Sequence, residues 1–155
     1  MKTWFSIREA ANLAGLKSSH MADYLARSGI VIPSIRTGAG RGRKRLYSFR
    51  DVVLLKAMGK LLSQQLPVRK LIEAQEEFKR LHLGKDEMAI ATRFLSTDGS
   101  KVYYCDNASA CIDLTQSGQM AFAFMLDIKA IGNETIEPAQ KMIEERNKRR
   151  GRSTE

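Results

Sequence analysis

Apolar residues recur at helical spacing in two short runs near the start of the chain, and a glycine closes each run. Ser6 and Glu9 match a capping box, in which both side chains satisfy free backbone amides at a helix start. We therefore expect one helix from residue 7 to Gly15, and a second from about residue 18 to Gly29. Two short helices joined by a tight turn predict a helix-turn-helix. The positions expected to face the core in the second helix are Met21, Tyr24 and Leu25.

The next stretch, residues 30–47, predicts a β-hairpin with a flexible basic tip. Pro33 excludes a helix before the hairpin tip, and three glycines alternate with other residues in the basic stretch 36–45. Ser48 and Asp51 repeat the capping pattern, and the helix behind them carries apolar residues at helical spacing. Pro67 then fits the first turn of a further helix.

After residue 84 the pattern changes toward a period of two, which is typical of strands. Residues 89–95 and 102–105 are strand-like and are joined around an Asp-Gly turn, and residues 112–114 add a short candidate. The apolar run over residues 120–129 also alternates, which favours a strand, with a buried helix as the alternative. From residue 137 the chain is charged, and we expect a frayed helix or a disordered tail.

These elements predict an α+β fold in which a winged helix-turn-helix precedes a small strand-rich segment. We assign residues 1–82 to the winged domain and residues 83–136 to a β-rich segment for dimerisation or partner binding. Residues 137–155 form the basic, partly disordered tail. A segment as short as 83–136 buries its surface poorly alone, so we expect it to pair with a second copy or with a partner protein.

The charge of the chain is strongly uneven. The formal net charge is +9. Residues 1–80 hold 16 Lys and Arg against 6 Asp and Glu, residues 81–140 hold 4 against 8, and residues 141–155 hold 6 against 3. This distribution indicates a polyanion-binding module joined to a segment that binds no polyanion. A basic surface that is merely solvated is the alternative.

Residues suited to catalysis or metal binding are scarce. The histidines His20 and His82 lie in different predicted elements, and Cys105 and Cys111 make a poor zinc site without them. We expect no enzyme activity, cofactor or metal. No apolar run approaches the ~20 residues of a membrane span, and the start does not resemble a signal peptide. We therefore expect a cytoplasmic, nucleoid-associated protein that does not bind membranes.

Double-stranded DNA fits the basic half, because a helix enters the major groove while clustered Lys and Arg follow the phosphates. In the second helix, the expected DNA-contacting residues are Lys17, Ser18, Ser19, His20, Ala22 and Asp23. In the hairpin, they are Arg36, Arg41, Arg43, Lys44, Arg45 and Tyr47.

Residues 4–80 resemble the DNA-binding domain of the MerR family. The stretches that carry the resemblance include F-S-I-R-E-A-A at 5–11, L-A-G-L at 13–16, R-T-G at 36–38 and R-L-Y-S at 45–48. The resemblance implies a winged helix-turn-helix whose second helix reads the major groove and whose wing contacts phosphates. It also implies a homodimer on a near-palindromic operator.

The chain departs from the family pattern in three ways. Ala22 stands where the second helix usually has an arginine, and the long dimerisation helix of typical metal sensors is missing after Phe78. Cys105 and Cys111 match no family metal site. The resemblance therefore carries DNA binding, but not metal sensing or promoter untwisting.

Three functions remain open from the sequence. The first is a homodimeric, sequence-specific transcriptional regulator. The second is an antitoxin whose acidic C-terminal half binds a toxin protein; residues 114–124 faintly resemble part of antitoxin-like proteins. The third is a DNA-bending or excision factor of a mobile element.

Overall fold

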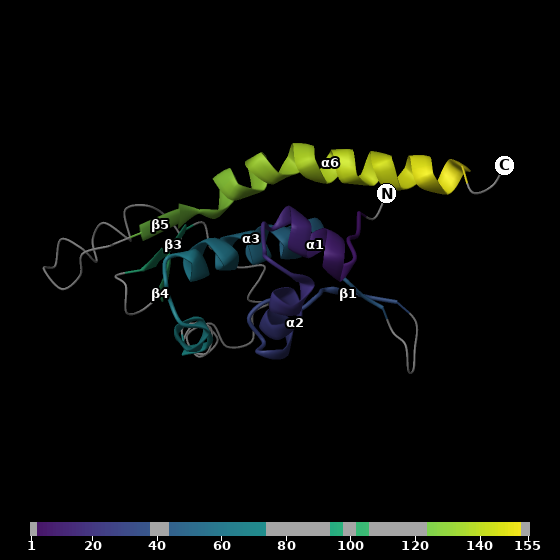
Figure 1. Ribbon diagram of the computed structural model, residues 1–155. Helices are drawn as coiled ribbons and strands as arrows, with labels where there is room; N and C mark the ends of the chain where they lie inside the picture. The colour runs from purple at the N-terminus through teal and green to yellow at the C-terminus, as the bar shows by residue number, and fades with distance from the viewer. Residues whose placement is uncertain (1–2, 38–43, 74–93, 98–101, 106–123, 153–155) are drawn as a thin grey trace, which may run out of the picture.

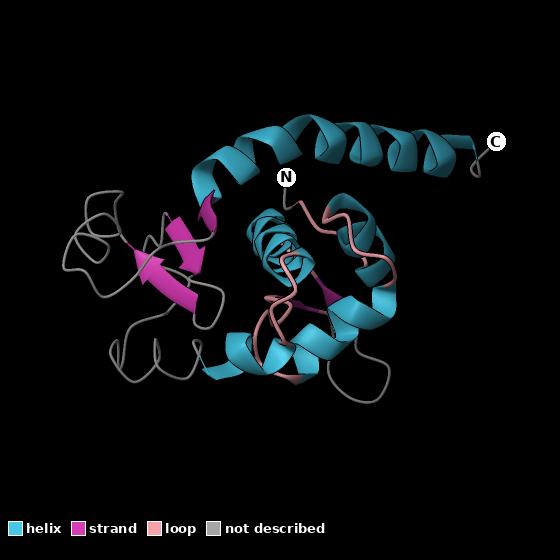
Figure 2. Ribbon diagram, turned by 60° about the vertical axis from the view of Figure 1, so that its left-hand side comes forward, coloured by secondary structure: helices cyan, strands magenta, loops and turns pink. Residues whose placement is uncertain are grey.

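The structure, a computed structural model, describes residues 3–37, 44–73, 94–97, 102–105 and 124–152 of the 155-residue chain. Helices predominate in these residues, and two small antiparallel sheets accompany them, as expected for a helix-turn-helix domain (Figures 1 and 2). None of the helices in the described ranges is both long and apolar enough to cross a bilayer.

The first helix, α1 (Ile7–Leu13), begins as the capping pattern predicts. The backbone amide of Ser6 donates to Glu9 Oε2 at 2.8 Å, and the amide of Glu9 donates to Ser6 Oγ at 3.3 Å. Gly15 follows with φ +70°, a conformation that glycine adopts without strain, and turns the chain toward α2 (Ser19–Arg27). The predicted helix-turn-helix is thus present.

The third helix, α3 (Phe49–Ser63), confirms the second capping prediction. Asp51 is 3% exposed, and its Oδ2 accepts from the amide of Ser48 at 2.8 Å. The same oxygen accepts from the amide and the hydroxyl of Ser34, at 2.9 and 2.7 Å. One carboxylate therefore caps α3 and ties it to the segment that enters the first strand. Residues 68–73 are helical, as the pattern after Pro67 predicts.

The strands β1 (Ile35–Arg36) and β2 (Arg45–Leu46) form an antiparallel pair in which Ile35 faces Leu46 and Arg36 faces Arg45. Phe5 and Tyr47 extend the ladder through two backbone hydrogen bonds of 2.9 and 2.8 Å. The segment before α1 is thereby joined to the end of β2. The tip of the predicted wing, residues 38–43, lies outside the described residues.

The second sheet has the order β4-β3-β5, from β3 (Phe94–Thr97), β4 (Val102–Cys105) and β5 (Phe124–Asp127). The strand predicted at 102–105 is confirmed. The one predicted at 89–95 is described only from residue 94 and continues to 97. The alternation over 120–129 is confirmed as a strand for 124–127, but it stops there because Asp127 Oδ1 accepts from the amides of Lys129 and Ala130, which begins a helix. The candidate strand at 112–114 lies outside the described residues.

The last helix, α6 (Ile128–Arg152), corrects the prediction of a frayed or disordered tail, because residues 137–152 are helical. Apolar residues alone are too few in this segment to predict a packed helix. The helix instead presents a mixed stripe to the core, in which small and amphipathic side chains continue the apolar spacing. This stripe contains Ile131, Thr135, Ala139, Met142, Ile143 and Arg146.

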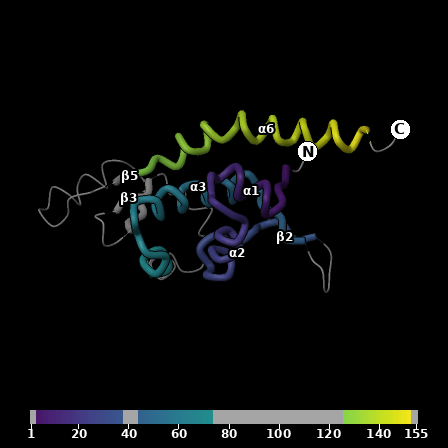
Figure 3. Tube along the Cα trace, viewed as in Figure 1, coloured from purple at the N-terminus to yellow at the C-terminus, as the bar shows by residue number. Residues whose placement is uncertain are grey.

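The trace in Figure 3 shows β5 running directly into α6, which then lies along α3 and α1. In Figures 1 and 2, α6 occupies the upper side of the molecule, and Figure 1 labels α2 at the lower side with α1 and α3 between. Buried residues from α1, α2, α3 and α6 join in one core, together with Leu71 of the helical stretch 68–73. Its largest members include Phe5, Leu25, Tyr47, Leu55, Leu61 and Ile131.

Candidate nucleic-acid interface

The helix α2 turns a different face to the core than the sequence interpretation assumed. Ala22 and Leu25 are fully buried, and Met21 packs partly against the core, whereas Tyr24 is 43% exposed. A stripe of 21, 24 and 25 and a stripe of 21, 22 and 25 both satisfy helical spacing. The structure has the second stripe, in which Ala22 and Leu25 are fully buried in the core. The burial of Ala22 does not fit the predicted DNA contact, and Tyr24 is wrong as a core residue.

The exposed face of α2 carries His20, Tyr24 and Arg27, at spacings of four and three residues, which places them on one side of the helix. The Asp23 carboxylate lies 3.0 Å from Nε of Arg27, and both side chains are exposed to solvent. Sequence reasoning missed Tyr24 and Arg27. The signal that could have found them is their spacing from His20 once Leu25 is fixed in the core.

The residues at the start of α2 keep their predicted exposure. Lys17 and Ser18 are exposed, and Ser19 is partly exposed. Ser18 is the N-cap residue, but its side chain makes no capping hydrogen bond with α2. The hydroxyl of Ser18 is therefore not committed to holding the helix start.

The β1–β2 pair separates apolar from basic side chains. Leu46 is buried with Ile35 opposite it, while Arg36 and Arg45, also opposite each other, are both exposed. Like charges placed directly across a ladder destabilise the strand pair. Within the described part of the chain, neither guanidinium has an ion-pair partner. Lys44 is exposed next to them, and Arg41 and Arg43 lie outside the described residues.

Tyr47 is only 1% exposed, which does not fit the DNA contact predicted for it. Burial raises the pKa of its phenol, and the carboxylates of Asp23 and Asp51 raise it further, against the lowering effect of Arg45. The side chain is thus a neutral member of the core. Tyr47, which directly follows β2, belongs to the same buried cluster as residues of α1 and α3.

A second cluster of charged residues lies between α1 and the end of α6. Arg146 Nη1 donates to the carbonyl oxygen of Trp4 at 2.9 Å and lies 3.4 Å from Glu9 Oε2. Its guanidinium carbon is 4.0 Å from the centre of the Trp4 ring, and that of Arg150 is 5.5 Å away. We call the contact of Arg146 with Trp4 and Glu9 the Arg146 clasp. Sequence reasoning missed it because the tail was expected to be frayed or disordered.

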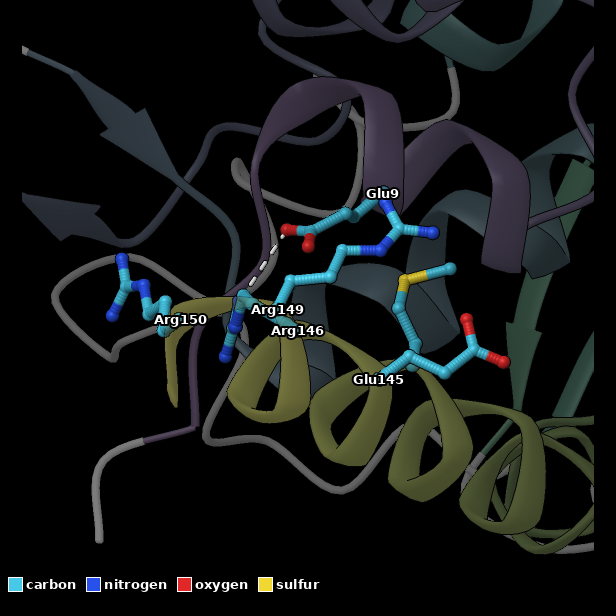
Figure 4. A pocket seen from close by; sticks show the side chains of 6 residues that line it. Glu9, Glu145, Arg146, Arg149 and Arg150 are labelled. Carbon is cyan, nitrogen blue, oxygen red and sulfur yellow. Dashed lines mark hydrogen bonds and ion pairs between the residues drawn. The ribbon is translucent and has the colours of Figure 1, made fainter. Parts of the chain in front are cut away.

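Figure 4 shows the pocket that borders the Arg146 clasp, with the dashed contact between Arg146 and Glu9. Its lining comes from α1 and α6 and consists of Glu9, Met142, Glu145, Arg146, Arg149 and Arg150. In the described residues, no group of three or more His, Cys, Asp and Glu side chains comes together to hold a metal ion.

Comparison with known proteins identifies relatives that contain a helix-turn-helix. Residues 5–77 match the sequence family described as MerR HTH family regulatory protein. Uncharacterized HTH-type transcriptional regulators from Mycobacterium bovis and from two strains of Mycobacterium tuberculosis are each 37% identical to this chain over 113 residues. The aligned part is 73% of this chain and 48% of each relative, so the chain spans about half the length of the curated relatives it matches. The resemblance found in the sequence is confirmed: residues 5–77 form a helix-turn-helix domain of the MerR family of regulatory proteins.

Proposed function

We propose that the chain is a sequence-specific transcriptional regulator that binds operator DNA as a homodimer. In this proposal, α2 enters the major groove and the β1–β2 pair follows the adjacent phosphate backbone. The observation that carries it is the exposed stripe of His20, Tyr24 and Arg27 on α2, the helix on the side of the domain opposite α6 (Figure 1). The homodimer and the near-palindromic operator come from the family resemblance.

The stripe on α2 has the chemistry that base edges and phosphates require. The Arg27 guanidinium supplies a fork that matches the acceptor pair on guanine, and Asp23 at 3.0 Å holds one side of that fork in place. His20 and Tyr24 each supply a hydrogen-bonding group on an aromatic ring. The usual arginine of this helix is absent at Ala22, and in this proposal Arg27 supplies the guanidinium.

The β1–β2 pair supplies the part of the binding that does not depend on base sequence. Arg36 and Arg45 repel each other in the free protein, and a phosphate group placed between them relieves that repulsion. Each phosphate contact that forms also releases counterions from the DNA. We therefore expect the two arginines and Lys44 to strengthen binding to every duplex, with strong salt dependence.

Three variants test the division of roles, on a duplex selected from a random library and on a shuffled duplex. Arg36→Ala with Arg45→Ala should weaken binding to both duplexes and reduce the slope of log K against log salt by roughly 0.9 per lost contact. The double variant His20→Ala and Tyr24→Ala should instead reduce the difference in binding affinity between the selected and the shuffled duplex. Lys129→Ala is the matched control, because it removes an exposed charge on α6.

Two outcomes would count against the proposal. An unchanged salt slope in the arginine variant would show that the β1–β2 pair does not contact the DNA phosphates. An equal loss on both duplexes in the His20 and Tyr24 variant would show that α2 does not read sequence. Marked DNA bending over clustered sites, or capture of a toxin protein by the C-terminal half, would favour the two alternative functions.

A further inference from the structure

We propose that Arg146 is a positioning residue for the DNA-binding surface: through the Arg146 clasp, α6 holds the Phe5–Tyr47 bridge and thereby the strand β2 that carries Arg45. The consequence for DNA affinity rests on the proposed function above. The structural part, control of the Phe5–Tyr47 bridge by α6, does not.

The helix α6 is anchored along its whole length. At its first turns, Glu134 accepts from Lys60 Nζ of α3 at 2.9 Å, with Lys56 at 3.9 Å. Ile131 in the first turn, and Thr135 and Ala139 beyond Glu134, are buried in the core. At its far end, the Arg146 clasp is the anchor, and it contacts Trp4 before α1 and Glu9 in the first turn of α1.

The Arg146 clasp depends on several contacts made together. The Arg146 side chain is only 17% exposed, and its Nε is buried with no hydrogen-bond partner among the described residues. Burial of a guanidinium is unfavourable unless its charge and its N–H groups are compensated. Here the compensation comes from the ring and carbonyl of Trp4 and the carboxylate of Glu9. Losing any one of these partners therefore weakens the whole contact.

The Arg146 clasp acts directly on the segment that joins the sheet. Trp4 precedes Phe5, whose amide and carbonyl exchange both hydrogen bonds with Tyr47. Tyr47 in turn follows β2 directly. Glu9, the other partner, uses the same Oε2 to accept the amide of Ser6 at the start of α1. Arg146 thus fixes both the edge of the β1–β2 ladder and the start of the helix-turn-helix.

The direction of the effect follows from these contacts. If the Arg146 clasp opens, residues 4–5 lose the support of α6, and the Phe5–Tyr47 bridge frays more often. Arg45 lies two residues before Tyr47, so its position relative to Arg36 becomes less defined. Because α6 lies on the side opposite α2 in Figure 1, this effect reaches the interface through the protein.

Amide hydrogen exchange followed by NMR tests the structural part without DNA. In Arg146→Ala, we expect the Phe5 and Tyr47 amides to exchange about tenfold faster relative to those of Leu55 and Leu61 in α3. Arg146→Lys keeps the charge but loses the planar fork, and we expect a smaller increase. Lys148→Ala is the matched control, since it removes a neighbouring exposed charge and leaves the Arg146 clasp intact.

DNA binding of the same variants tests the consequence. We expect Arg146→Ala to weaken binding to the selected duplex about fivefold and to lower its salt slope, with Lys148→Ala close to the wild type. Equal acceleration of the Phe5, Tyr47 and α3 amides would overturn the positioning role, since it would show a general loss of stability. Faster exchange of the bridge with unchanged DNA affinity would overturn the link to binding. A wild type that binds no DNA would contradict the proposed function alone, because the exchange experiment would still decide the structural part.

Discussion

Replacing Asp51 by alanine should destabilise the domain more than the loss of any exposed carboxylate. Asp51 is 3% exposed, and one of its oxygens accepts three hydrogen bonds, from the amide of Ser48 and from the amide and hydroxyl of Ser34. Hydrogen bonds to a charged group contribute about 1.5–3 kcal/mol each in mutational series, and removing the carboxylate takes the acceptor away from all three part-buried donors. The relief of desolvating one buried charge offsets part of that sum. We expect a net loss of about 3 kcal/mol in the free energy of unfolding.

Urea unfolding followed by circular dichroism measures this loss through the midpoint and the m-value. Asp51→Asn keeps an oxygen acceptor at nearly the same position and should lose about half as much. Asp23→Ala is the matched control, because its carboxylate is exposed and pairs with Arg27 along α2, so we expect a change within about 0.5 kcal/mol. A loss below about 1 kcal/mol for Asp51→Ala would refute the reasoning that this carboxylate joins α3 to the strand β1.

Two further predictions concern the packing of α2 and the anchor of α6. Ala22→Leu overfills the fully buried site of Ala22 and should lower the free energy of unfolding by about 1–3 kcal/mol. Tyr24→Ala changes an exposed side chain and should alter the free energy of unfolding by less than about 0.5 kcal/mol. The reverse order in urea unfolding would support the orientation of α2 predicted from the sequence, with Tyr24 in the core. The hydrogen bond from Lys60 lowers the pKa of Glu134 below its ordinary value, with Lys56 contributing and burial opposing. The ion pair therefore stabilises the fold above the unfolded-state pKa of Glu134, and this contribution is lost as the pH falls through the lowered folded-state value. In Lys60→Ala, an NMR titration should find the pKa of Glu134 shifted upward, and an unchanged value would contradict the assigned cause.

The first two helices and the start of α3 were predictable because their signals are local. A capping box needs only two side chains three residues apart, and both predicted boxes are present at Ser6 and Ser48. The orientation of α2 was not predictable from spacing, because two registers place three apolar side chains on one face. What decides between them is the packing of Ala22 into the core, which depends on tertiary contacts.

The end of the helix α6 was not predictable from composition, which indicated a frayed or disordered tail. Most residues beyond Ile143 are charged, yet Arg146 is largely buried because Trp4, distant in the sequence, supplies an aromatic ring and a carbonyl for it. No local pattern contains that information. The candidate DNA-contacting residues show the same limit, since Tyr47 and Arg36 belong to the same predicted hairpin, yet Tyr47 is buried and Arg36 is exposed.

Selection of duplexes from a random DNA library tests the central claim, that α2 reads a DNA sequence. The account predicts enrichment of a near-palindromic motif whose half-sites lie about one helical turn apart, bound roughly 10³-fold or more tightly than shuffled DNA. The His20→Ala and Tyr24→Ala double variant should lose or change that motif. No enriched motif, or the same motif with the double variant, would contradict sequence reading by α2 and leave the basic half of the chain as an electrostatic anchor.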